Sequence, residues 1–249
     1  MLVIAAFVYS ASNLGFADLG RLGRGVSNLG SLVAEMLPPD LGVASEVAAA
    51  LAETIQIAFV GTVIGFLLSM PFSALALRNI FPSPLTTTVR SLLGIVRTIP
   101  ALFWAVLFVI AVGLGPFAGT LAVAVYSFGY LSKLYYEAFE AVDAEVLDAL
   151  RVTGASRILL VRHAVLPESM NTIVSQLLFM FEYNIRSSAV LGFVGAGGVG
   201  FLMVSYIESL RYSSLTTVLV FTLATVIAID IVSGYVRRRF LPGFRPASA

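Results

Sequence analysis

Three polar residues, Glu182, Asn184 and Arg186, interrupt an otherwise apolar stretch that covers about residues 168–190. Ionisable side chains in such a stretch are costly and usually face a bundle interior, a water-filled cavity or one another. Glu182 and Arg186 are four residues apart, so on a helix they would share a face and could neutralise each other. The alternative is a functional role in which Asn184 or Arg186 contacts an anionic solute.

A glycine run, GAGGVG at residues 195–200, satisfies the G-x-G-x-x-G spacing of dinucleotide-binding loops. That fingerprint also requires a preceding strand and an acidic residue about 20 positions further on. No acidic residue stands near that position, and the flanking sequence is typical of membrane helices. We therefore interpret the run as a site of close packing or bending, and favour an external turn at the mouth of a pathway.

Other chemistry is restricted by composition. The chain has no cysteine, which excludes disulfides and thiolate metal sites, and its single histidine excludes a histidine-based metal cluster. Its net charge of +1 provides no basic face for nucleic acid. The phosphate-binding sequence G-x-x-x-x-G-K-[S/T] is missing, so we expect no nucleotide and no other cofactor to bind to this chain.

The elements that position these residues must lie in lipid. Of the 249 residues, 59% are hydrophobic and 12% are charged, whereas soluble domains have about 45–50% apolar and about 25% charged residues. A membrane-spanning helix needs roughly 20 mostly apolar residues. Five stretches meet this requirement, at 54–77, about 91–112, 117–140, 168–190 and 212–236, with the second and third divided by GLGPFAG at 113–119.

The first 46 residues are less regular. The apolar residues 1–11 would form either part of a sixth spanning helix or an interfacial turn. Residues 12–46 carry apolar side chains at the spacing of a helix that lies on the membrane surface, namely Leu22, Val26, Leu29 and Val33.

The orientation follows from the distribution of Lys and Arg. If the loop at 141–167 is cytoplasmic and the helices alternate, eleven of these residues lie inside and three outside. Because cytoplasmic loops carry an excess of positive charge, we expect the C-terminus to be cytoplasmic as well.

The cytoplasmic loop itself contains a short amphipathic segment, EVLDALRV at 145–152. It places Val146, Leu147 and Leu150 on one helical face, and Gly154 then ends the helix. An exposed apolar stripe on such a helix would dock into a groove of a partner protein. The alternative is an interfacial loop whose arginines extend to lipid headgroups.

The spacing of this loop resembles the EAA loop of ABC-importer permeases, in which E-A-A, three residues, Gly and nine residues precede I-x-L-P. Asp148, Ala149 and Leu150 take the E-A-A positions, Gly154 follows in register, and 164–167 reads AVLP. The resemblance implies a coupling helix that docks into a cytosolic ATPase subunit. The implied coupling residues are Glu145, Leu147, Asp148, Ala149, Leu150, Gly154, Ala155 and Arg157.

A second resemblance narrows the subgroup. FEYNIRSSAVLGFVGAGGVG at 181–200, together with RTIP at 97–100, is similar to the signature of phosphonate-uptake permeases. The resemblance covers about residues 45–240. It implies a translocation pathway that involves Arg97, Pro100, Glu182, Asn184, Arg186, Ser187, Gly195, Gly197 and Gly198.

Taken together, the resemblances imply an all-α integral membrane protein of five to six transmembrane helices with the type I ABC-importer permease (MetI-like) fold, in the bacterial cytoplasmic membrane. Residues 1–46 would form a partial membrane helix and an external segment, 47–240 the permease domain and 241–249 a cytoplasmic tail. The implied partners are a second copy of the chain, two cytosolic ATPase subunits that bind ATP and Mg²⁺, and an extracytoplasmic solute-binding protein.

The implied cargo is a phosphonate or a related small phosphorus oxyanion. Phosphate, phosphite or an amino acid is the alternative within this class. An ion-coupled secondary transporter would need ion sites near broken helices, and an intramembrane enzyme would have only carboxylates and serines to work with.

Overall fold

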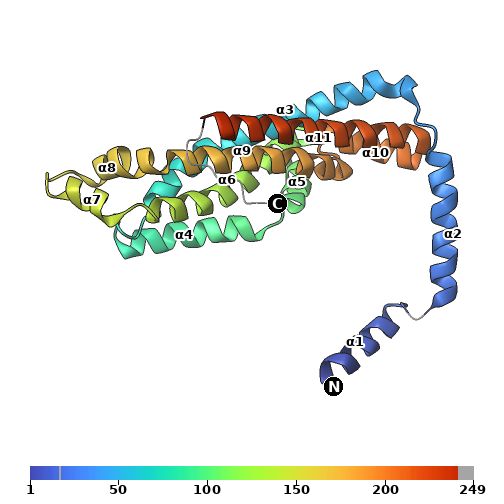
Figure 1. The fold of residues 1–249 in the computed structure, drawn as a ribbon, viewed down its shortest axis with the longest axis horizontal. Coiled ribbons are helices and arrows are strands. Elements are labelled where there is room, and N and C mark those ends of the chain that lie inside the picture. Colours follow the sequence, from blue (N-terminus) through green and yellow to red (C-terminus); the bar gives the residue numbers. More distant parts are fainter. Residues whose placement is uncertain (17, 241–249) are drawn as a thin grey trace.

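The computed structural model describes residues 1–16 and 18–240, and the expected tail at 241–249 lies outside the described residues. The protein is all-helical and contains several apolar helices, which confirms the predicted fold class. Its long helices are α3 (Ala44–Leu75), α4 (Ser83–Thr98), α6 (Pro116–Glu140), α9 (Leu166–Leu191) and α11 (Tyr212–Phe240). These helices lie roughly alongside one another in an elongated bundle (Figure 1).

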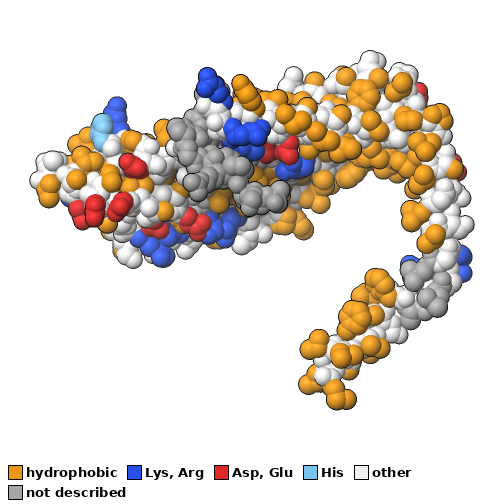
Figure 2. Space-filling model, viewed as in Figure 1, with side chains coloured by type: hydrophobic (Ala, Val, Ile, Leu, Met, Phe, Trp, Pro, Cys, Tyr) orange, Lys and Arg blue, Asp and Glu red, His pale blue; other side chains and the backbone are white. Residues whose placement is uncertain are grey.

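Shorter helices occupy the ends of the bundle. At one end lie α7 (Ala144–Arg151) and α8 (Arg157–Leu160), and a π-helical turn, Val161–Val165, leads from α8 into α9. At the other end lies α10 (Gly198–Glu208), which the sequence analysis did not predict. Figure 2 shows charged side chains gathered towards the α7 end, whereas hydrophobic side chains cover most of the opposite part.

The centre of the bundle is the contact between α3 and α6, where two glycines allow close packing. A Cβ added at Gly61 would lie 2.6 Å from Val123 Cγ1, and one added at Gly65 would lie 2.5 Å from Ser127 Cβ. Small residues with this four-residue spacing let membrane helices approach closely. The two glycines therefore determine how near α3 can lie to α6.

Among residues 1–16 and 18–240, three helical segments are long and apolar enough to cross a membrane, namely Leu41–Leu75, Arg157–Val194 and Tyr212–Arg239. A bent pair, α4 with α5 (Ala101–Val112), becomes a fourth if it counts as one span. Helix α6 is not in this group although it has 25 residues. Neighbouring helices bury many of its small and polar residues, so α6 does not need to be apolar on every side.

The stretch at about 91–112, predicted as one spanning helix with a kink at Pro100, is instead divided into two helices. The axes of α4 and α5 differ by 83°, and Ile99 between them has extended backbone angles, φ −85° and ψ 119°. Pro100 explains the break, because its ring disfavours helical geometry at the preceding residue and it has no N–H for a helical hydrogen bond. Pro71, by contrast, lies within α3.

The N-terminal segment forms an arm that leaves the bundle near the start of α3 (Figure 1). It consists of α1 (Leu2–Asn13) and α2 (Leu19–Met36), joined to α3 through a 3₁₀ turn at Leu41–Val43. Residues 1–11 thus contribute to a helix and not to an interfacial turn. The 12 residues of α1 rise by about 18 Å, which is less than the roughly 30 Å of a hydrocarbon core.

Candidate functional site

The predicted coupling helix is present as α7. The carboxylate of Asp143 caps its first turn by accepting a hydrogen bond from the Glu145 N–H at 3.3 Å. Glu145, Asp148 and Ala149 are exposed on its outer face. The helix therefore presents two acidic residues and one small residue to the surroundings.

The expected apolar stripe does not face outwards, and this part of the prediction is wrong. Leu147 is only 2% exposed, and Val146 and Leu150 are half-buried against the same hydrophobic cluster. Leu77, just after α3, and Phe139, in the last turn of α6, belong to that cluster, so the stripe packs against other parts of the same chain. The sequence pattern could identify an apolar face but not which protein would cover it.

Other apolar side chains in the loop remain exposed. Val152 is 85% exposed and Ile158 is 74% exposed. Between them Gly154 adopts a φ of +75°, and a Cβ there would meet nothing within 4 Å. Gly154 thus serves the backbone turn and not a close contact, because a positive φ is readily adopted only by glycine. Ala155 is half-buried, and Arg157 is exposed.

Glu182 and Arg186 of α9 pair with residues of α11 and not with each other. Glu182 forms an ion pair with Arg237 at 2.8 Å, and Arg186 lies 3.7 Å from a carboxylate oxygen of Asp230. The predicted neutralisation of Glu182 by Arg186 is therefore wrong. The antiparallel α11 carries Asp230 and Arg237 two turns apart, and Arg186 and Glu182 each lie opposite one of them.

Arg186 and Ser187 line an open groove between α5 and α9, with a volume of about 370 Å³. Ala101, Leu102 and Tyr183 are among the other lining residues. The Arg186 side chain is 46% exposed. The groove thus contains one guanidinium group whose counter-ion lies beyond hydrogen-bonding distance.

Two further predicted pathway residues, Arg97 and Pro100, are close in sequence to residues that line this groove. Arg97 is exposed in the last turn of α4, and no ion pair or hydrogen bond joins its side chain to another described residue. Pro100, which is also exposed, directly precedes the lining residues Ala101 and Leu102.

Asn184 and Glu182 do not reach the groove. Asn184 is completely buried, and its Nδ2 donates hydrogen bonds to Thr62 Oγ1 at 2.8 Å and to Ser127 Oγ at 2.7 Å. These bonds join α9 to α3 and α6. In this conformation the four predicted pathway residues of α9 therefore divide into a groove-facing pair, Arg186 and Ser187, and a pair in the bundle interior.

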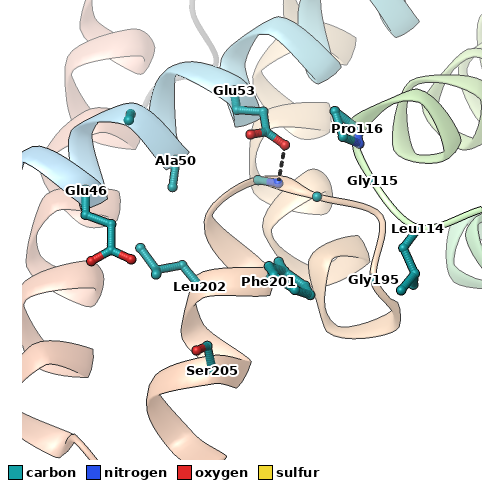
Figure 3. Close-up of a pocket in the computed structure, with 13 residues that line it drawn as sticks. Glu46, Ala50, Glu53, Leu114, Gly115, Pro116, Gly195, Phe201, Leu202 and Ser205 are labelled. Carbon is teal, nitrogen blue, oxygen red and sulfur yellow. Dashed lines mark hydrogen bonds between the residues drawn. The ribbon is translucent and has the colours of Figure 1, made fainter.

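The glycine run forms a turn between α9 and α10, as expected. Gly195, Gly197 and Gly198 all have a positive φ, between +71° and +83°. Glu53 Oε1 accepts a hydrogen bond from the Gly198 N–H at 3.0 Å (Figure 3), and Thr54 Oγ1 accepts one from the Val199 N–H at 2.8 Å. Helices flank the turn on both sides, so it lacks the strand of a dinucleotide site.

A cavity of about 500 Å³ adjoins this turn. Glu46 and Glu53 of α3 face it together with Phe201 and Ser205 of α10 (Figure 3). Glu46 also accepts a hydrogen bond from the Tyr206 hydroxyl at 2.8 Å. Burial, followed by the neighbouring Glu46 carboxylate, raises the pKa of Tyr206 to about 12, so the phenol keeps its proton at neutral pH.

Sequence reasoning did not single out the partners of these residues. Neither Glu53 nor Arg237 was among the predicted site residues. Glu53 could have been noticed because it is a charged residue at the edge of the apolar stretch 54–77. Arg237 could have been considered as a counter-ion for Glu182, an acidic residue within a predicted membrane span.

The protein is a bundle of apolar helices around buried polar residues. It has a groove that contains an arginine and a short helical loop at one end. These features are typical of membrane transport subunits. The sequence profile of a family described as "Binding-protein-dependent transport system inner membrane component" matches residues 61–246. This match covers most of the chain, and the protein belongs to that family.

Three relatives have high similarity over most of the chain. A putative phosphite transport system permease protein of Stutzerimonas stutzeri is 37% identical over 88% of this chain and 78% of its own length. A phosphite transport system permease protein of the same organism is 34% identical over 91% of this chain and 83% of its own length. A phosphate-import permease protein of Mycolicibacterium smegmatis is 40% identical over 83% of this chain but only 39% of its own length.

Solved structures support the fold. An inward-facing methionine ABC transporter contains a chain with a TM-score of 0.72 and 24% identity, over 80% of this chain and 98% of that chain. An amino acid ABC transporter gives a TM-score of 0.65 with 18% identity, over 82% of this chain and all of that chain. At these identities the likeness shows the shared ABC-importer permease fold.

Proposed function

We propose that this protein is the transmembrane subunit of an ATP-driven importer that translocates a phosphonate or a related small phosphorus oxyanion. Two copies would form the pathway, two cytosolic ATPase subunits would bind ATP and Mg²⁺, and an extracytoplasmic binding protein would deliver the solute. Membership of a binding-protein-dependent family and the phosphite and phosphate relatives support this proposal. Phosphate and phosphite remain alternative cargoes of the same chemical kind.

The observation that carries the proposal is the position of Arg186 in the groove between α5 and α9. A guanidinium group presents a rigid fork of donors that matches the oxygens of a phosphoryl group. Arg186 is half-exposed, and Asp230, its counter-ion, is 3.7 Å away and 58% exposed. An oxyanion in the groove can therefore reach the guanidinium without breaking a tight, buried ion pair.

The coupling surface under this proposal consists of the exposed Ala149, Val152 and Ile158 together with the acidic face of α7. Apolar side chains that are exposed in water favour contact with a partner. The chain offers no Walker A sequence of its own, so ATP hydrolysis is assigned to the partner. Under this proposal α7 and the C-terminus lie on the cytoplasmic side.

The experiment is uptake of labelled phosphite, phosphate and methylphosphonate into proteoliposomes that contain the complete importer and its binding protein. We expect Arg186→Ala to lower uptake by about tenfold, as for the loss of one charge-assisted hydrogen bond. Arg238→Ala is the matched control, because Arg238 is an exposed arginine of α11 without an ion pair to a described residue.

Uptake at the wild-type level in Arg186→Ala would contradict the role of the groove. Uptake that follows an ion gradient in vesicles without the ATPase would instead favour a secondary transporter. Uptake of methionine but of none of the three anions would assign the subunit to another cargo class.

A further inference from the structure

Helix α7 is attached by a specific polar contact to the segment that joins α3 to α4, residues 76–82, which we call the α3–α4 corner. Arg151, the last residue of α7, donates a hydrogen bond from Nη2 to the backbone carbonyl of Asn79 at 2.6 Å. Its Nη1 bonds to Asp148 Oδ1, one turn earlier in α7, at 2.9 Å. Because the guanidinium is planar and both of its ends are occupied, its orientation is fixed relative to α7 and to the corner.

Apolar packing joins the same two elements beneath this contact. Leu147 of α7 is 2% exposed and belongs to one hydrophobic cluster with Leu77 and Ile80 of the corner. A protein core is close-packed and transmits displacement instead of absorbing it. The Arg151 contact and the leucine packing therefore make α7 and the corner move together.

The corner is in turn fastened to the middle of α4 and to the end of α6. Glu140, the last residue of α6, accepts a hydrogen bond from the Arg78 N–H at 2.8 Å and forms an ion pair with Arg90 of α4 at 2.5 Å. Arg90 Nε also donates to the Ala76 carbonyl at 2.9 Å, and its guanidinium lies over the ring of Tyr136. The corner thus holds the start of α4 in a fixed relation to α6.

The far end of α4 leads to the groove. At Ile99 and Pro100 the chain turns by 83° into α5, and the first two residues of α5, Ala101 and Leu102, line the groove together with Arg186. No helical hydrogen bond can be donated by Pro100, so the bend is the place where α4 and α5 can change their relative angle. A rigid helix that ends in a hinge connects the corner with the groove wall.

We infer that Arg151 is a positioning residue for transport: it holds α7 to the α3–α4 corner, so that movement of α7 reaches the groove through α4 and the bend at Pro100. This inference rests on the proposed docking of α7 to the ATPase. It assigns to Arg151 a role inside this chain, separate from any contact that α7 makes with the partner.

The test uses the complete importer in proteoliposomes and measures both solute uptake and ATP hydrolysis. Without the Arg151 contact, α7 should still dock to the ATPase and ATP should still be hydrolysed. Movement of α7 should, however, displace the groove less. We expect Arg151→Ala to keep the ATPase bound and hydrolysing, and to lower the solute taken up per ATP by about tenfold, the factor for one charge-assisted hydrogen bond. Arg151→Lys retains a cationic donor that can reach the Asn79 carbonyl, and should recover most of this ratio.

The matched control is Arg162→Ala, an exposed arginine of the same loop without an ion pair to another described residue, which should leave the ratio unchanged. A second arm exploits the absence of cysteine from the chain. In the double variant Asn79→Cys, Arg151→Cys, a short bifunctional thiol reagent should restore the ratio, and the free thiols should not.

An unchanged ratio in Arg151→Ala would overturn the inference, as would a fully cross-linked double variant that remains uncoupled. Loss of the ATPase from the Arg151→Ala complex would also overturn it, because Arg151 would then act at the partner interface. If the proposed function itself is wrong, the result will be different: the wild-type chain will neither bind the ATPase nor depend on it for uptake.

Discussion

Glu182 of α9 and Arg237 of α11 form a short ion pair, 2.8 Å long, in which the two side chains are only 6% and 16% exposed. One turn further along α9, Arg186 and Asp230 are 3.7 Å apart and about half-exposed. The same two helices are therefore joined by one tight, buried pair and one loose, open pair. The first is suited to holding the helices together, and the second leaves its arginine accessible to an anion.

Glu182→Gln should destabilise the protein strongly, because it leaves Arg237 without its counter-ion. Removal of one partner from a buried ion pair typically costs about 3–5 kcal/mol. Asp230→Asn should cost much less, about 0–1 kcal/mol, because its pair is exposed and loose. Thermal unfolding of the detergent-solubilised protein, followed by circular dichroism, compares the two.

Equal losses in the two variants would contradict this division of roles. A charge-reversed double variant, Glu182→Arg with Arg237→Glu, provides a further control. It should regain part of the stability that either single reversal loses, because the opposite charges again face each other.

The structure shows which of these relationships were accessible from the sequence. Spacing arguments compare residues within one helix, so they proposed Glu182 with Arg186 and could not identify Arg237, which lies 55 positions away in the chain. The helical coupling segment, the glycine turn and the apolar helices follow from local patterns, and these were predicted. Which surface of α7 is covered depends in part on Leu77, which lies 70 positions before Leu147 in the chain.

The break at Pro100 has a different explanation. Its proline was noticed and interpreted as a kink within a span, but the apolar composition on both sides favoured a continuous helix. Composition indicates whether a segment can lie in lipid or in water, but it does not indicate the direction of the helix axis. The sequence therefore indicated that Pro100 permits a break, but not that the helix axis turns by 83° there.

Gly65→Ala should loosen the central contact between α3 and α6. The added Cβ would lie 2.5 Å from Ser127 Cβ and 2.8 Å from the Ala124 carbonyl oxygen, so the helices must separate. Overpacking of this kind typically costs about 1–3 kcal/mol. Gly94→Ala in α4 is the control, because nothing lies within 4 Å of its added Cβ. The unfolding midpoint should fall for Gly65→Ala only.

Glu53→Ala should release the glycine turn from α3 by removing the carboxylate that accepts the Gly198 N–H. We expect a loss of about 1.5–3 kcal/mol, as for a hydrogen bond to a charged group, and faster hydrogen exchange at residues 195–199. Glu53→Gln keeps an acceptor oxygen and should show the smaller effect. Exchange at the wild-type rate in Glu53→Ala would mean that Thr54 alone holds the turn.

Val152→Asp should weaken binding of the ATPase subunit without affecting the fold. Val152 is 85% exposed, so a charged side chain at this position meets water in the free subunit, but it would be buried in the proposed contact. Leu150→Asp cannot separate the two effects, because Leu150 also packs against the hydrophobic cluster under α7. Co-purification with the ATPase should therefore fall for both variants, whereas the unfolding midpoint should fall only for Leu150→Asp. If Val152→Asp retains the ATPase at the wild-type level, the partner does not contact this side of the loop.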